Sequence, residues 1–141
     1  MEDAMVGETD LGKLLATMRP VLAEGVYMFA TIAKGDSAPA GVEPVMMFRE
    51  AEGLTLIVDE ATAKQYGLAA IFRSRMITLD VHSSLEAVGF LAAITACLAK
   101  AGMGVNPVAG YYHDHLFVPE DRAEEAMNLL HQLAQDAGRT S

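Results

Sequence analysis

An internal repeat constrains the fold of this chain more than any other feature of its sequence. Four residues recur at a constant spacing of sixty: Leu56, Val58, Glu60 and Ala63 match Leu116, Val118, Glu120 and Ala123. Earlier, the segment Leu22-Ala23-Glu24 before Gly25 resembles Leu98-Ala99-Lys100 before Gly102, at a spacing of seventy-six or seventy-seven. Matches of this kind indicate one structural unit used twice. We therefore expect two units, residues 1–70 and 71–141, with a loop at 33–43 inserted in the first.

The first unit is predicted to alternate helices and strands around one long loop. Its expected elements are a helix at 11–18, a strand at 26–32, the loop at 33–43, strands at 45–50 and 54–58, and a helix at 60–66. Asp10 and Asp59 stand where helix-capping side chains are expected. The loop is rich in Gly, Pro and Ser, which favour turns over regular structure.

The second unit is predicted to follow a similar order. Its expected elements are an extended segment at 71–81, a helix from 85 to about 101, strands at 105–111 and 116–118, and a helix from Pro119 onward. Ser83 and Glu86, three residues apart, predict a capping box at the start of the first helix. Gly102 is placed to end that helix, and a polar turn is expected at His113-Asp114. This order predicts an α+β fold with helices on one face of the sheets.

Composition excludes several classes of partner. Hydrophobic residues make up 52% of the chain, and ten basic against nineteen acidic residues give a formal net charge of −9. That charge repels phosphate backbones and anionic lipid headgroups, so we expect neither nucleic acid nor a membrane surface as a partner. The first ten residues carry four acids and no base, unlike a secretory signal, and Cys97 has no second cysteine to pair with. We therefore expect a cytoplasmic protein.

The second unit also resembles a known family. A strand at 76–81, Val88-Gly89 near the start of a helix, and the run from Leu98 to Val105 into a strand follow the β-α-β-β-α order of ACT domains. The whole chain is similar to short tandem ACT-domain proteins, related to the regulatory domains of aspartate kinases. In them a segment Phe-Arg-Glu-x-Glu-Gly-Leu-Thr recurs, here Phe48 to Thr55. The resemblance implies two ferredoxin-like (βαββαβ) units with antiparallel sheets, which bind amino acids or other small ligands.

A ligand site is implied by the same resemblance, around the start of the helix in the second unit. A helix N-terminus presents free N–H groups and a positive dipole end to a carboxylate, and a nearby glycine lets a ligand approach the backbone. The candidate residues are His82, Ser83, Ser84, Leu85, Val88, Gly89, Gly104, Val105 and Asn106. Plain helix capping is the competing interpretation for the two serines, and His82 could simply face solvent.

One cluster suggests different chemistry. His113 and His115 have the alternate spacing that points two strand side chains to one face, where they could bind a metal. A catalytic zinc site needs three protein ligands, and His131 is a loose candidate for the third. A solvated hairpin turn explains these residues more simply. The sequence holds no nucleophile elbow, Walker loop or zinc-protease motif, so we predict no catalytic residue, no metal and no cofactor.

These observations lead us to expect a regulatory or sensing module that binds a small molecule, an amino acid in the simplest case, without catalytic activity of its own. Two alternatives stay open. A structural protein-interaction module that has lost ligand binding is favoured by Glu86 and Gly104, which depart from the family's pattern. A small metal-dependent enzyme would use His113 and His115. The helix over 85–99 is apolar on nearly every face, which predicts a homodimer or higher homo-oligomer.

Overall fold

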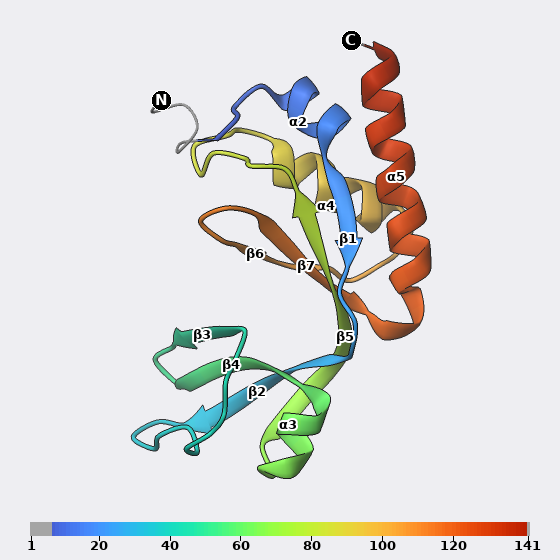
Figure 1. Cartoon of the computed structure of the whole chain (residues 1–141). Helices are drawn as coiled ribbons and strands as arrows, with labels where there is room; N and C mark the ends of the chain where they lie inside the picture. Colours follow the sequence, from blue (N-terminus) through green and yellow to red (C-terminus); the bar gives the residue numbers. More distant parts are fainter. Residues whose placement is uncertain (1–6, 141) are drawn as a thin grey trace. The chain divides into compact units, whose positions relative to one another are not determined.

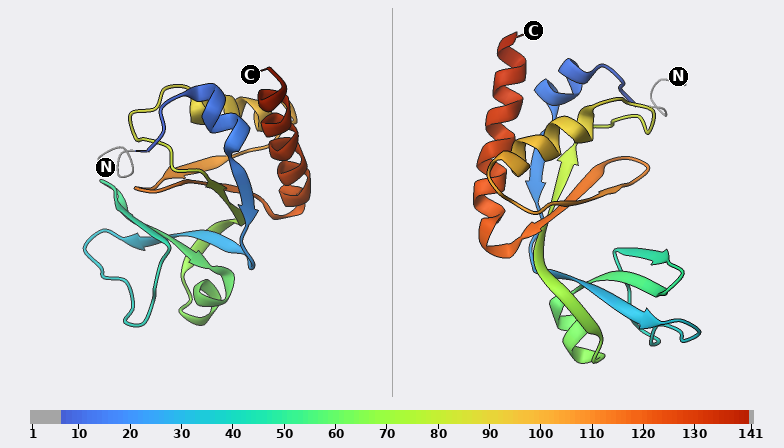
Figure 2. Two further views of the ribbon diagram at one scale, coloured as in Figure 1. Left: turned by 45° about the horizontal axis from the view of Figure 1, so that its top comes forward. Right: turned by 180° about the vertical axis from the view of Figure 1, so that it is seen from behind.

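The computed structural model describes residues 7–140, which form two compact units. The central unit is Glu24–Arg75, and the terminal unit joins the chain up to Ala23 to the chain from Met76 onward. Both units combine antiparallel strands with helices (Figures 1 and 2), so the predicted α+β fold is confirmed. These compact units have other boundaries than the two sequence repeats at 1–70 and 71–141, and the division into those repeats stays a prediction.

The central unit is a four-stranded sheet with one helix. Its elements are β2 (Tyr27–Ala33), β3 (Met46–Arg49), β4 (Gly53–Asp59), α3 (Glu60–Gln65) and the first part of β5 (Ala69–Asp80). The strands lie in the order β3-β4-β2-β5, and the paired strands are antiparallel. Helix α3 covers one face, where its Ala63 is buried together with Ala30, Ile32, Leu56 and Val58.

The terminal unit has a sheet of four strands and a larger helical layer. Its strands, in order, are β1 (Arg19–Leu22), the second part of β5, β7 (Asp114–Pro119) and β6 (Asn106–Ala109). Its helices are α2 (Leu11–Thr17), α4 (Phe90–Lys100), a short 3-10 turn (Glu120–Arg122) and α5 (Ala123–Thr140). Alternate residues of β5 and β7 pack against the three α-helices in one core, which includes Ile77, Leu79, Leu116, Val118, Leu14, Ile94, Leu98 and Leu130.

The sixty-residue repeat is visible in the structure. Leu56 and Val58 of β4 are buried, and the chain then enters α3 with Ala63 in the core. Their matches Leu116 and Val118 of β7 are buried in the same way, before Ala123 at the start of α5. The earlier match is wrong, because Leu22 lies in β1 whereas Leu98 lies in α4. Strand β1 is not among the strands predicted from the sequence. Its four residues are too few to show a periodic pattern, and it forms by pairing with β5.

The loop predicted at 33–43 is confirmed, but it is not an insertion. Residues 34–45 connect β2 to β3 without a helix, whereas α4 fills the corresponding connection between β5 and β6. Gly35 and Gly41 have φ values of 91° and 93°, which L side chains rarely adopt, and Pro39 and Pro44 lack the N–H that a helix interior requires. The central unit therefore keeps the strands of the repeat and replaces one helix by a loop.

Two predicted details around α4 and β7 are wrong. The capping box of Ser83 and Glu86 does not form, because the helix begins at Phe90 with Gly89 as its N-cap. Instead, the Glu86 N–H donates to Ser84 Oγ at 3.0 Å, a local bond that competes with helix formation. The turn lies earlier than expected, over residues 110–113, and is closed by the Gly110 N–H, which donates to the His113 carbonyl at 2.8 Å, so that Asp114 is already part of β7.

No helix within residues 7–140 is long and apolar enough to cross a membrane.

Candidate ligand-binding site

The terminal unit contains a pocket of about 150 Å³ at the N-terminal end of α4. Three segments form it: the loop after β5, the first turn of α4, and the ends of β6 and β7 that flank their connecting turn. Its lining residues are Ser83, Ser84, Leu85, Ala87, Gly89, Phe90, Leu91, Ala92, Ala109 and Asp114. Backbone and small side chains therefore make up most of the wall, with one carboxylate among them.

The first turn of α4 supplies hydrogen-bond donors to this pocket. The Ala93 N–H bonds to the Gly89 carbonyl at 2.9 Å, so the N–H groups of residues 90–92 precede the first bond of the helix. Gly89 has φ 92° and makes no side-chain cap. Free N–H groups and the positive end of the helix dipole attract a negatively charged group at this position.

Asp114 supplies the opposite charge. Its side chain is 7% exposed, and Ser83 Oγ donates to its Oδ2 at 3.2 Å. Burial raises the pKa of the Asp114 carboxyl, and the bond from Ser83 and the nearby histidines oppose that rise. Burial also lowers the pKa of His115, which favours the neutral imidazole beside this acid. A buried carboxylate without a full counter-charge is suited to binding a cationic group.

The N-terminal segment of the chain holds the loop that carries Ser83. The Glu8 N–H donates to the His82 carbonyl at 2.8 Å, and the Ser84 N–H donates to the Glu8 carbonyl at 2.9 Å. Gly7 makes this approach possible, because its φ is 81° and a Cβ there would lie 2.8 Å from the His82 carbonyl oxygen. Two residues at the start of the described chain thus position one wall of the pocket.

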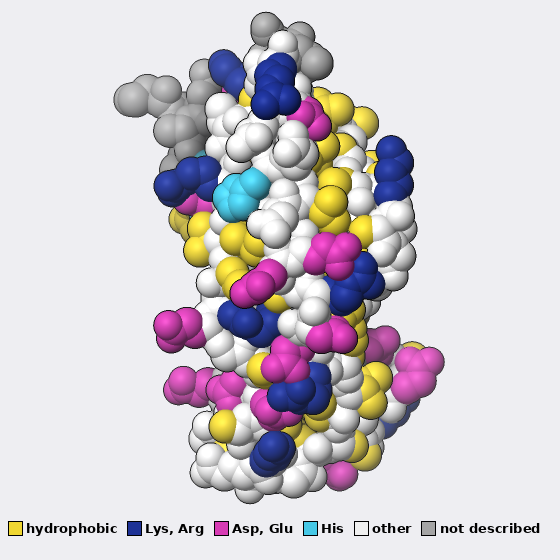
Figure 3. Space-filling view, turned by 90° about the vertical axis from the view of Figure 1, so that its right-hand side faces the viewer, with side chains coloured by type: hydrophobic (Ala, Val, Ile, Leu, Met, Phe, Trp, Pro, Cys, Tyr) yellow, Lys and Arg dark blue, Asp and Glu magenta, His cyan; other side chains and the backbone are white. Residues whose placement is uncertain are grey.

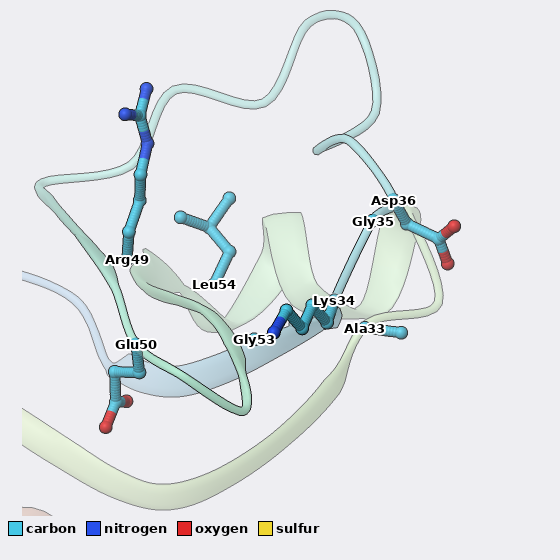
Figure 4. Close-up of a pocket in the computed structure, with 8 residues that line it drawn as sticks. All are labelled: Ala33, Lys34, Gly35, Asp36, Arg49, Glu50, Gly53 and Leu54. Carbon is cyan, nitrogen blue, oxygen red and sulfur yellow. The ribbon is translucent and has the colours of Figure 1, made fainter.

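A second pocket, of about 250 Å³, lies in the central unit (Figure 4). It is formed by the end of β2, the loop that follows, and the hairpin of β3 and β4, with Ala33, Lys34, Gly35, Asp36, Arg49, Glu50, Gly53 and Leu54 as lining residues. Arg49 and Leu54 precede Ala109 and Asp114 by the sixty residues of the repeat. Each unit therefore has a pocket at the same place in its strand order.

A third cavity, of about 430 Å³, lies between α4 and α5, and its walls are mainly apolar. Ala93, Ala96 and Cys97 line it from α4, and Leu129 and Leu133 line it from α5. Figure 3, the view onto α5, shows hydrophobic side chains reaching the surface beside this helix. Burial raises the pKa of the Cys97 thiol, which keeps it protonated and unreactive.

Comparison with known proteins identifies the family to which these units belong. Two family models match, both of them ACT domains, one over residues 6–75 and the other over residues 71–132. The chain is a tandem ACT-domain protein. The pocket beside Asp114 lies within the second match, and the pocket beside Arg49 lies within the first. The resemblance seen in the sequence is therefore confirmed.

Solved structures include similar proteins of nearly the same length. A Vibrio cholerae protein of unknown function, described as a possible transport protein, is 44% identical, with a TM-score of 0.79 and coverage of 88% of this chain and 95% of that one. The regulatory subunit of aspartate kinase from Thermus flavus is 14% identical, with a TM-score of 0.61 and coverage of 84% and 98%. That second likeness shows the shared fold. A search of curated proteins found no match.

The structure brings four of the nine candidate residues together around the pocket of the second ACT domain: Ser83, Ser84, Leu85 and Gly89. His82 is adjacent, and its ring lies 5.8 Å from that of Tyr112. Val88 is 84% exposed. Gly104, Val105 and Asn106 lie between the end of α4 and the start of β6, and they do not line the pocket. The role of these nine residues in ligand binding stays a prediction.

Asp114 is the residue that sequence reasoning missed. The sequence predicts a solvated turn at this residue, yet Asp114 has the same parity along β7 as Leu116 and Val118, which are both buried in the core. Extending the strand alternation back by one step would have placed it on the covered face.

His113 and His115 do lie near each other, with ring centroids 6.5 Å apart. Their Nδ1 atoms are occupied: that of His115 lies 2.9 Å from Thr78 Oγ1, and that of His113 lies 3.2 Å from the Val81 carbonyl. Within residues 7–140, no group of three or more His, Cys, Asp or Glu side chains is placed to hold a metal ion. The local geometry accounts for both histidines without a ligand.

Proposed function

We propose that this tandem ACT protein is a regulatory module, without catalytic activity of its own, that binds an amino acid in the pocket of the second ACT domain. The observation that carries the proposal is the pairing of opposite charge preferences in one small pocket. The first turn of α4 attracts a carboxylate, and Asp114 attracts an ammonium group. A zwitterion with both groups on one carbon matches that arrangement.

The size of the pocket limits the ligand. Its volume of about 150 Å³ is smaller than the about 250 Å³ of the pocket in the central unit and leaves room for a small ligand. Apart from Asp114 and the two serines, its wall is apolar and includes the small side chains of Ala87, Ala92 and Ala109. We therefore infer that the preferred amino acid has a short side chain without charge.

The comparisons support a regulatory role. A similar structure is described as the regulatory subunit of aspartate kinase, and both halves of this chain match ACT domains, which are regulatory modules. A ligand regulates by its difference in affinity between two arrangements of the protein or its partner. We propose that the module acts in this way in the cytoplasm as a homodimer or higher homo-oligomer. Binding of the amino acid to one subunit would then shift the arrangement of its partner subunits.

Isothermal titration calorimetry with the twenty amino acids tests this proposal. We expect a small uncharged amino acid to bind, and Asp114→Asn to weaken its affinity at least about tenfold, or about 1.4 kcal/mol, because the amide cannot neutralise an ammonium group. Asp121→Asn, an exposed acid outside the pocket, is the matched control and should leave the affinity unchanged. Equal affinity in both variants would place the ligand elsewhere.

Analogues separate the two halves of the pocket. A carboxylic acid that lacks the amino group should bind the native protein more weakly than the amino acid does. The two compounds should bind the Asp114→Asn variant with equal affinity. Failure of all twenty amino acids to bind the folded protein would contradict the proposal and favour an interaction module that has lost ligand binding.

A further inference from the structure

The pocket of the central unit has the same place in the repeat as the pocket beside Asp114, but it contains two basic side chains that the other pocket lacks. Leu54 stands at the position of Asp114, so the buried acid is absent there. Arg49 stands at the position of Ala109, which adds a cation, and Lys34 at the end of β2 adds another. A site with two cations in a chain of net charge −9 calls for a specific explanation.

These two cations are not used by the fold. Within residues 7–140, neither Lys34 nor Arg49 makes an ion pair or a side-chain hydrogen bond. Arg73 of the same unit, in contrast, bonds to Glu60 at 2.6 Å and 3.1 Å. Because neither cation has a side-chain partner among these residues, both are available to bind an external anion.

The two acids of the pocket do not neutralise the cations. The Glu50 carboxylate accepts a hydrogen bond from Thr55 Oγ1, and in Figure 4 it points away from Lys34 and Arg49. The Asp36 carboxylate points away on the opposite side of the pocket (Figure 4). In the same view Arg49 extends beside Leu54, and Lys34 lies beside Gly53, so the two basic groups border different parts of the pocket.

The backbone fixes the position of Lys34 relative to the hairpin. Gly53 pairs with Ala33, and a Cβ on Gly53 would lie 2.6 Å from the Ile32 carbonyl oxygen, so only glycine allows β2 and β4 to pair up to their ends. The chain then turns at once, with the Asp36 N–H bonded to the Ala33 carbonyl at 3.0 Å and Gly35 at φ 91°. Lys34 is held in this turn beside the start of β4.

We propose that the central unit holds a second ligand site, specific for a small anion whose carboxylate or phosphate oxygens are bound by Lys34 and Arg49. The guanidinium of Arg49 offers paired N–H donors that match two such oxygens, and the Lys34 ammonium adds a point charge. The volume of about 250 Å³ is larger than that of the pocket beside Asp114, so it admits an organic anion with two oxyanion groups. The two ACT domains then bind ligands of different charge, a zwitterion beside Asp114 and an anion beside Arg49.

Titration of the full chain with succinate and with inorganic phosphate tests the site, followed by calorimetry or amide chemical shifts. We expect at least one probe to bind with a Kd of about 1 mM or lower, and the Lys34→Gln/Arg49→Gln double variant to weaken that binding at least about tenfold. Lys64→Gln, an exposed cation of α3 in the same unit, is the matched control and should change the affinity less than about twofold. Tighter binding of one probe identifies the class of oxyanion.

Three results would overturn the proposal: no binding of either probe to the native protein, equal affinity in the native protein and the double variant, or an equal loss in Lys64→Gln, which would indicate diffuse attraction. Asp114→Asn separates this site from the amino-acid site. That variant should leave succinate and phosphate binding unchanged whether or not amino acids bind. Tighter binding in the variant would show that the probes occupy the other pocket, because the substitution removes a carboxylate that repels them there.

Discussion

At the scale of single residues, the account depends on an acid that the fold tolerates at a cost. Asp114 is buried with one neutral hydrogen-bond donor, Ser83, and burial raises the pKa of its carboxyl above the ordinary value of 3.8. Because the folded state binds the proton more tightly than the unfolded state, the ionised form of Asp114 destabilises the empty protein. A bound ammonium group would remove that penalty.

Asp114→Asn should therefore stabilise the empty protein while it weakens ligand binding. At pH 7 we expect the free energy of unfolding to rise by about 1 kcal/mol, since Asn keeps the bond to Ser83 without a charge. The stability contributed by Asp114 is present below pH 3.8 and is lost as the pH rises through the raised pKa, so the gain in the variant should vanish in acid. Urea unfolding at pH 3 and pH 7 measures this. A loss of stability at pH 7 would contradict the proposed cost of the buried charge.

Ligand affinity should show the opposite dependence on pH. Asp114 must be ionised to bind an ammonium group, so the affinity should fall as the pH is lowered through its raised pKa, before an ordinary aspartate would protonate. Calorimetric titrations between pH 7 and pH 4 measure the midpoint. An affinity that stays constant down to pH 4 would show that another group binds the ammonium.

Gly7 should matter for both the fold and the site. A Cβ at this position would lie 2.8 Å from the His82 carbonyl oxygen, on backbone at φ 81°, so Gly7→Ala should cost about 1–3 kcal/mol and displace the loop of Ser83. Gly12→Ala is the control, because its nearest neighbour would be 3.6 Å away and alanine favours helix α2 by up to about 1 kcal/mol. The midpoint temperature of thermal unfolding and the affinity for the amino acid should both fall in Gly7→Ala, and neither should fall in Gly12→Ala.

At the scale of elements, local signals predicted most of the fold and tertiary contacts decided the rest. The capping residues Asp10 and Asp59 were predicted, and their carboxylates accept bonds from the N–H groups of Lys13 and Thr62. Gly102, at φ 73°, follows α4 as predicted. The sequence does not predict strand β1, because this strand depends on its pairing with β5. It predicts the start of α4 too early, because the residues around Ser84 resemble a helix cap but form a local hydrogen bond outside the helix.

The true start of α4 makes Gly89 the critical glycine of the site. Valine there would force a β-branched residue to φ 92° at the point where the first free N–H groups meet the pocket. Gly89→Val should weaken amino-acid binding at least about tenfold. Gly104→Ala is the matched control, because its Cβ would enter open space away from the pocket, and the affinity should change less than twofold. A larger effect at Gly104 would move the site to the start of β6.

At the scale of the whole molecule, one repeat has been adapted in two ways. In both units a strand with a buried leucine, Leu56 or Leu116, is followed by a helix. The terminal unit has a helix before β6, whereas the central unit has a loop before β3. The sequence predicted the fold class, and it predicted the neighbourhood of Ser83 and Gly89 through a resemblance. It did not predict Asp114 or the basic pocket, because both depend on which strand positions come together in space.

Self-association stays a prediction at this scale, and the structure gives it a location. Ala93, Ala96 and Cys97 of α4 leave an apolar cavity of about 430 Å³ open beside α5. Because exposed apolar surface of this kind favours contact with another subunit, light scattering during size-exclusion chromatography should find a dimer or larger assembly. Ala96→Glu should shift it toward monomer, and Ala109→Glu, outside this face, is the control. A native protein that elutes as a monomer would contradict the prediction.

The most direct test of the central claim is an amide chemical-shift titration with the tightest-binding amino acid. The account predicts the largest changes at the N–H groups of residues 90–92 and at Ser83 and Asp114, with much smaller changes in the Asp114→Asn variant. Changes confined to residues 104–106, or spread evenly over both units, would contradict it.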